Sequence, residues 1–125
     1  MGRVIKIGFC GPQRSGKTTA AQYLHDQCGA TVLSLADPIK QIALDLFQMK
    51  GKDRRLLIGI GESLRALEPL VFCNALYRRI QSLPDNSIVV IDDVRSLIEW
   101  HYLHHAGFHL AVIHAPLEVR SSRPG

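Results

Sequence analysis

Eight residues near the N-terminus have the types and spacing that bind phosphate groups. The run Gly11-Pro12-Gln13-Arg14-Ser15-Gly16-Lys17-Thr18 matches the pattern GxxxxGK[ST] at every fixed position. In this pattern the glycines let the backbone curl so that its N–H groups point at phosphate oxygens. The lysine places a positive charge beside the β- and γ-phosphates, and the threonine hydroxyl can ligate Mg²⁺. The residues predicted to bind ATP are Gly11, Arg14, Ser15, Gly16, Lys17, Thr18 and Thr19.

The flanking sequence gives this pattern its structural context. Residues 3–10 are predicted to form a strand, and residues 17–28 are predicted to form a helix. The phosphates would then lie at the positive N-terminal end of that helix. The alternative is a glycine-rich turn beside an unrelated lysine, and the strand–loop–helix context argues against it.

Two neighbouring acids form a second candidate group for chemistry. Asp92 and Asp93 follow the β-branched run over residues 88–91, which reads as a strand buried on both faces. In open parallel sheets, ligands bind beyond the carboxyl ends of the strands, so the pair is expected at the same edge as the phosphate loop. Asp92 is predicted to hold Mg²⁺ together with Thr18, and Asp93 to help position substrate. The alternative is that the pair caps the next helix.

The elements that must position these groups alternate between strand and helix. Apolar runs predict four strands, and helical spacing of apolar residues predicts the segments between them. Together they predict an α/β fold of the three-layer P-loop NTPase type, with a parallel sheet, in a single domain over residues 1–125. The expected strands are 3–10, 31–35, 88–91 and 110–114; the expected helices are 17–28, the segment after Asp37-Pro38, 62–82 and 96–106, with a short segment over 54–60 and a helix boundary at Gly61.

Composition narrows the classes of partner. The net charge is +4, but no long basic run or aromatic-interleaved basic strand is present, so no nucleic-acid partner is expected. Scattered arginines suit phosphates of small substrates better, although Arg78 and Arg79 are expected on a solvated helix face. No segment approaches the roughly 18 apolar residues of a membrane span, so no membrane partner is expected. The cysteines Cys10, Cys28 and Cys73 are expected to be reduced core thiols in a cytoplasmic protein.

The residues after the predicted acid-bearing strand indicate a family. Asp93-Val94-Arg95, with Glu99 four residues after the arginine, resembles the P-loop deoxynucleoside monophosphate kinases and their nucleoside monophosphate kinase relatives. Residues 34–40 and 55–65 are similar to two further elements of that family. The resemblance implies an enzyme that transfers a phosphoryl group from ATP, with Mg²⁺, to a (deoxy)nucleoside monophosphate.

The same resemblance implies roles for individual residues. Arg65 and Arg95 would hold the acceptor phosphate, while Asp37 and Asp93 would lie at the acceptor pocket. Fixed cations are also what two polyanions need if they are to approach one another. For Arg65 the alternative is a solvated position on a helix surface. The residues expected to act on the transferring phosphoryl group are Lys17, Asp92, Arg95 and Arg123.

The C-terminal segment resembles only the opening of the family's lid. Residues 115–123 match that opening, and the chain is expected to stop before the rest of the lid and the last strand. A missing edge strand would expose apolar surface and unpaired backbone, so a homodimer is predicted. This chain has Ser96-Leu97-Ile98 where the family has Phe-Pro-Asn. The family also has an aromatic residue, often tryptophan, in the helix after Arg65, and Phe72 is expected to take its place.

Other functions stay open on the sequence alone. One is a kinase for another small phosphorylated metabolite, because phosphomevalonate kinases are similar in the Asp-x-Arg region. Another is a nucleotide-binding protein with little or no turnover. His101, His104 and His105 share one helix face and could bind zinc, but they are explained as well by a surface helix.

Overall fold

The computed structural model describes residues 3–11 and 16–113, which form a parallel sheet with helices on both faces. The prediction of one domain over the whole chain extends beyond these ranges and stays a prediction. In chain order the elements of the described residues are β1 (Ile5–Cys10), α1 (Lys17–Cys28), β2 (Thr31–Leu33), α2 (Asp37–Phe47), α3 (Arg54–Leu67), α4 (Val71–Gln81), β3 (Ile88–Val94), α5 (Leu97–His105) and β4 (His109–Val112).

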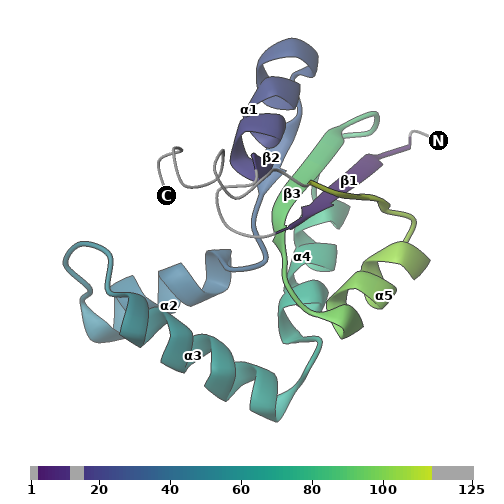
Figure 1. The fold of residues 1–125 in the computed structure, drawn as a ribbon. Coiled ribbons are helices and arrows are strands. Elements are labelled where there is room, and N and C mark those ends of the chain that lie inside the picture. The colour runs from purple at the N-terminus through teal and green to yellow at the C-terminus, as the bar shows by residue number, and fades with distance from the viewer. Residues whose placement is uncertain (1–2, 12–15, 114–125) are drawn as a thin grey trace.

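The sheet has the strand order β2-β3-β1-β4, and every neighbouring pair is parallel. Helix α1 lies against one face, where Ala21 and Ala30 pack with Val90 in one buried cluster. Helices α4 and α5 cover the other face, in the cluster that contains Val89 and Ile91 (Figure 1). Successive side chains of β3 therefore enter opposite layers, as strand geometry requires. The predicted three-layer α/β fold of the P-loop NTPase type is confirmed.

A β-bulge interrupts the pairing of the two central strands. Gly8 pairs with Ile91, whereas Cys10 pairs with Val94, so β3 carries one extra residue between these two partners. The acids Asp92 and Asp93 fall within this interval. The predicted strand over 88–91 is therefore too short, because β3 continues through both acids to Val94. Bulges of this kind redirect side chains and are common beside functional sites.

The predicted division of the middle helices is wrong. Instead of a short segment and a long helix over 62–82, the chain forms α3 and α4 with a break at Glu68-Pro69. The side chain of Asp53 accepts a hydrogen bond from the Leu56 N–H at 3.1 Å and begins α3. Glu68 is extended (φ −150°, ψ 107°), as expected for a residue before proline, and this ends the helix. Gly61 is not a boundary but a buried residue within α3.

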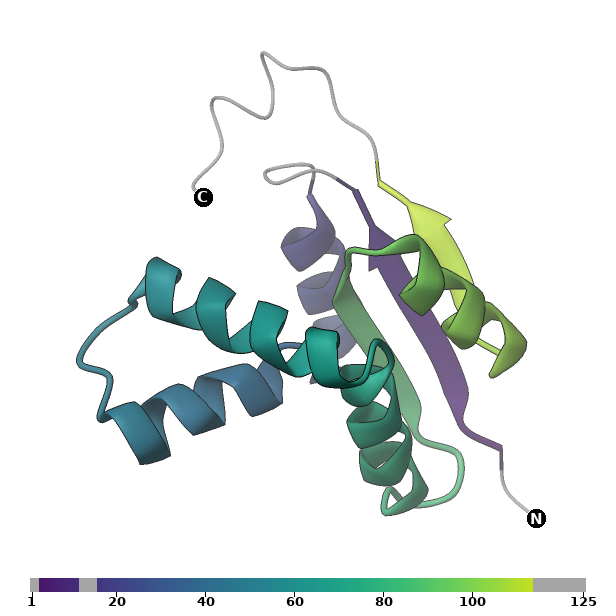
Figure 2. The ribbon, with the colours of Figure 1, turned by 90° about the horizontal axis from the view of Figure 1, so that it is seen from below.

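Helices α2 and α3 form an antiparallel hairpin that extends away from the sheet (Figures 1 and 2). The helix predicted after Asp37-Pro38 is confirmed as α2, with the proline in its first turn. The other predicted strands and helices differ from the observed ones only at their ends. One predicted core thiol is misplaced: Cys28 is exposed at the last residue of α1, while Cys73 is buried. None of the helices in residues 3–11 and 16–113 is both long and apolar enough to span a membrane.

Candidate functional site

The start of α1 presents backbone donors at the edge of the sheet. Gly16 adopts a left-handed conformation (φ 104°, ψ 11°) and leads directly into the first residue of the helix, Lys17. No side chain caps this end of α1, and its first turn contains no acidic residue. Its N–H groups and the helix dipole therefore favour an anion at this point. The predicted ATP-binding residues Arg14 and Ser15 lie outside the described residues.

The side chain of Lys17 reaches back to the end of β1. Its ammonium Nζ donates a hydrogen bond to the carbonyl oxygen of Gly11 at 2.6 Å. This contact joins the end of β1 to the start of α1 and holds the positive charge beside the N-terminus of the helix. The predicted ATP-binding residues Thr18 and Thr19 follow on the same helical turn, and both are exposed.

Asp92 lies in the same corner as the first turn of α1. Burial raises the pKa of Asp92 above its ordinary value, and the charge of Asp93 raises it further. A hydrogen bond from the Thr18 side chain and the charge of Lys17 act in the opposite direction on this pKa. The structure thus brings together the carboxylate and hydroxyl oxygens predicted to hold Mg²⁺. Oxygen donors of this type fit Mg²⁺, which takes few protein ligands when it is bound with phosphates and water.

Asp93 turns away from this corner and anchors the segment between β2 and α2. It is 8% exposed and accepts hydrogen bonds from Ser34 Oγ at 2.5 Å, Leu35 N at 2.9 Å and Ala36 N at 3.0 Å. The alternative that the acid pair caps the next helix is wrong. Ser96 caps α5 instead, and its Oγ accepts from the Glu99 N–H at 3.2 Å.

Asp37 begins α2 at the far end of that segment. It accepts hydrogen bonds from Ser34 N at 3.1 Å and from Arg79 Nη1 at 2.6 Å. Arg79 lies on an exposed face of α4, as predicted, and it forms an ion pair with Asp37 there. The predicted acceptor-pocket acids Asp37 and Asp93 therefore both hold the connection between β2 and α2, which the sequence had not indicated.

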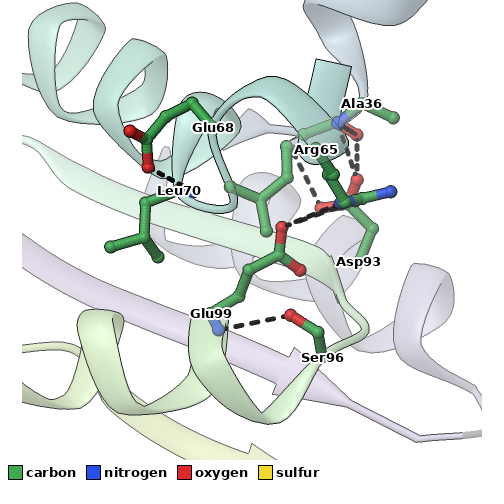
Figure 3. Close-up of polar contacts among 9 residues, drawn as sticks. Ala36, Arg65, Glu68, Leu70, Asp93, Ser96 and Glu99 are labelled. Atoms are coloured by element: carbon green, nitrogen blue, oxygen red, sulfur yellow. Dashed lines mark hydrogen bonds and ion pairs between the residues drawn. The ribbon is translucent and has the colours of Figure 1, made fainter. Parts of the chain in front are cut away.

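Arg65 is not a solvated surface residue. Its Nε and Nη2 both lie 3.4 Å from Glu99 Oε2 (Figure 3). Its guanidinium carbon lies 4.8 Å from the centre of the Phe72 ring. The sequence did not predict this contact between Arg65 on α3 and Glu99 on α5. The pattern Ser96-x-x-Glu99 would instead have suggested a capping box, in which the glutamate bonds to the serine N–H.

The remaining predicted residues are placed as follows. Arg95 is exposed and directly follows Val94, which pairs with the last residue of β1. It therefore lies at the edge where β1 enters the phosphate loop. Arg123 lies outside the described residues. Among residues 3–11 and 16–113, no three or more His, Cys, Asp or Glu side chains form a group that could hold a metal ion. The described histidines of α5 thus form no such site with their neighbours.

Comparison with known proteins gives a partial relative. No protein-family model matches the chain. A protein of Acanthamoeba polyphaga mimivirus named "Putative deoxynucleotide monophosphate kinase" is 48% identical over 44 residues, which are 35% of this chain. The matched part spans 23% of that relative, so the chain corresponds to about a quarter of its length. The likeness favours a relationship to nucleotide kinases and covers a minority of each chain.

Proposed function

We propose that this chain transfers a phosphoryl group from ATP to the phosphate of a (deoxy)nucleoside monophosphate, giving ADP and the diphosphate. The observation that carries the proposal is the division of the two acids on β3. Asp92 faces Thr18 and Lys17 at the start of α1, whereas Asp93 ties down the segment that leads to Asp37. The region proposed to bind the triphosphate and the region proposed to bind the acceptor therefore each contact one of two neighbouring residues of β3. The name of the partial relative supports the same reaction class.

Each group has a task in direct, in-line transfer without a covalent enzyme intermediate. Lys17 and the first-turn N–H groups of α1 bind the triphosphate, while Thr18 and Asp92 supply oxygen ligands to the metal. Mg²⁺ held by these two residues would supply positive charge against the phosphates. Arg65 and Arg95 hold the acceptor phosphate, because two polyanions can approach only where cations offset their repulsion. Arg123 completes the set of cations around the transferring group.

Acceptor-dependent ADP release tests this proposal. With ATP and Mg²⁺ supplied, a panel of deoxynucleoside monophosphates, nucleoside monophosphates and phosphomevalonate should give turnover with at least one nucleotide. Turnover with phosphomevalonate alone would show that the acceptor is this kind of metabolite and not a (deoxy)nucleoside monophosphate. ATP binding without ADP release on any acceptor would contradict the kinase function and favour a nucleotide-binding protein.

The substitution Asp92→Asn is expected to affect stability and activity in opposite directions. Because the pKa of Asp92 is raised in the folded state, its contribution to stability is favourable at acid pH and is lost as the pH rises through that pKa. The asparagine variant should therefore resist urea better than the wild type at neutral pH. This gain should vanish in acid, where the wild-type carboxyl is protonated in the folded and the unfolded state alike.

The same variant should lose metal-dependent activity by about 10- to 100-fold, a usual cost when the ligand shell of a metal is altered. Urea denaturation at neutral and acid pH, together with ADP release at several Mg²⁺ concentrations, measures both effects. Asp85→Asn, at an exposed turn, is the matched control and should change neither. A variant that is less stable than the wild type at neutral pH would show that Asp92 has a structural role instead.

A further inference from the structure

The guanidinium of Arg65 is held on several sides by neighbouring groups. Its Nε–Nη2 edge faces Glu99 Oε2, and one of its faces covers the Phe72 ring. Its Nη1 lies over Gly61, where an added Cβ would be 3.4 Å from that nitrogen, at ordinary contact distance. The side chain nevertheless keeps 34% of its surface exposed. Arg65 therefore has a fixed orientation and an accessible remainder, as an anion receptor requires.

Glu99 holds Arg65 at an energetic cost to the fold. Its side chain is 0% exposed, and within the part of the chain that the structure describes its Oε1 has no hydrogen-bond partner. Only Oε2 is paired, and both of its contacts are long at 3.4 Å. A buried carboxylate with one unsatisfied oxygen is a poor way to stabilise a core, where an apolar side chain of similar volume often does better. Packing alone therefore does not explain why a glutamate with an unpaired Oε1 is buried at this position.

Glu99 and Asp93, the second acid of β3, both act on the buried thiol of Cys73. Burial raises the pKa of Cys73 to about 12, with Glu99 as the next largest cause and Asp93 also raising it. Arg65 acts on the same thiol in the opposite direction. These four side chains thus act on one another in the region between α3, α4, α5 and β3, and Figure 3 shows the guanidinium of Arg65 meeting the carboxylate of Glu99 there.

We propose that Glu99 is a positioning residue for the acceptor site. It holds the Nε–Nη2 edge of Arg65, so that the donors at the exposed end of the guanidinium meet the phosphate of the monophosphate. The inference rests on the proposed function, because Arg65 has this task only if an acceptor phosphate binds there. A flexible arginine would have to be ordered when the acceptor binds, whereas one tied by Glu99 and Phe72 is already oriented.

The variant Glu99→Met tests the proposal, because methionine is apolar, similar in length and suited to the buried site. We expect the KM for the monophosphate to rise about tenfold, with kcat at saturating acceptor and the KM for ATP changed less than about twofold. Glu99→Gln keeps one oxygen that can accept from Arg65, so its KM should rise less. Glu62→Met, at an exposed glutamate of α3, is the matched control and should leave all three constants unchanged.

A double-mutant cycle separates positioning from a general loss of structure. Once Arg65→Met has raised the KM for the monophosphate, adding Glu99→Met should raise it no further. An unchanged or lower KM in Glu99→Met, or the same fold-increase in the presence and absence of Arg65, would overturn the proposal. If Glu99→Met fails to fold in a thermal melt, Glu99→Gln provides the same test through its smaller expected rise in KM.

The proposed function and the positioning role can fail separately. A wild-type chain that binds a monophosphate in calorimetry but does not turn it over would contradict the kinase function. The Kd values of the Glu99 variants for that monophosphate would then still report on positioning. A wild-type chain that binds no monophosphate would overturn both.

Discussion

Replacing Lys17 with alanine is expected to reduce acceptor-dependent ADP release by about 10²- to 10³-fold, the usual loss when one preorganised transition-state donor is removed. Lys17 lies at the first position of α1, and its ammonium is already held at the mouth of the loop by the Gly11 carbonyl, 2.6 Å away. A charge fixed beside the helix N-terminus needs little rearrangement to meet the β- and γ-phosphates. Losing it would leave their developing charge without its nearest cation.

The measurement is steady-state ADP release over a range of ATP concentrations. Lys52→Ala is the matched control, because that lysine is exposed between α2 and α3 and should leave the rate unchanged. Since the hydrogen bond to Gly11 is also lost, a decrease of about 1 kcal/mol in the free energy of unfolding is expected. Activity within a few-fold of the wild type would show that the loop at Gly11–Thr18 does not bind the transferred phosphate.

Replacing Asp93 with alanine is expected to lower the free energy of unfolding by about 4 kcal/mol, because three donors would lose a charged acceptor. The donors are Ser34 Oγ and the N–H groups of Leu35 and Ala36, and Leu35 is itself only 1% exposed. Water cannot readily reach a donor buried at that depth. The loss is large relative to the roughly 5–15 kcal/mol that stabilises a typical domain.

Urea denaturation measures this effect. Asp93→Asn should lose less stability than Asp93→Ala, because its amide oxygen can still accept from one or two of the donors. Asp85→Ala removes an exposed carboxylate from the turn before β3 and should change stability by no more than about 0.5 kcal/mol. Equal stabilities of Asp93→Ala and Asp85→Ala would mean that the segment between β2 and α2 is held by other contacts.

The alternation of strands and helices could be predicted because its signals are local. An apolar β-branched run such as Ile88–Ile91 and helical spacing after Pro38 depend on neighbours within a few residues. The start of α3 at Asp53 and the break before α4 at Pro69 also have local signals in the sequence. The glycine at 61 misled the prediction, since a glycine can mark either a helix end or the close approach of another side chain. Here the reason is close approach, because a Cβ at this position would lie 3.1 Å from the side chain of Ile39.

The contacts that complete the site could not be predicted, because they join residues far apart in the chain. Glu99 lies 34 positions after Arg65, and no pattern in the sequence of either helix predicts that the two side chains are in contact. The bulge at Asp92 and Asp93 could not be predicted either, because it is a property of the register between β1 and β3. The predicted homodimer and the absence of nucleic-acid partners stay predictions.

Asp92 and Asp93, which lie in the bulge of β3, are joined by a single peptide bond. Because consecutive Cα atoms of a trans peptide are about 3.8 Å apart, Asp92 beside the first turn of α1 and Asp93 at the β2–α2 segment have a backbone separation that no loop motion can alter. In the proposed function, the distance between the ATP site and the acceptor site is therefore set at one end by the peptide bond between Asp92 and Asp93.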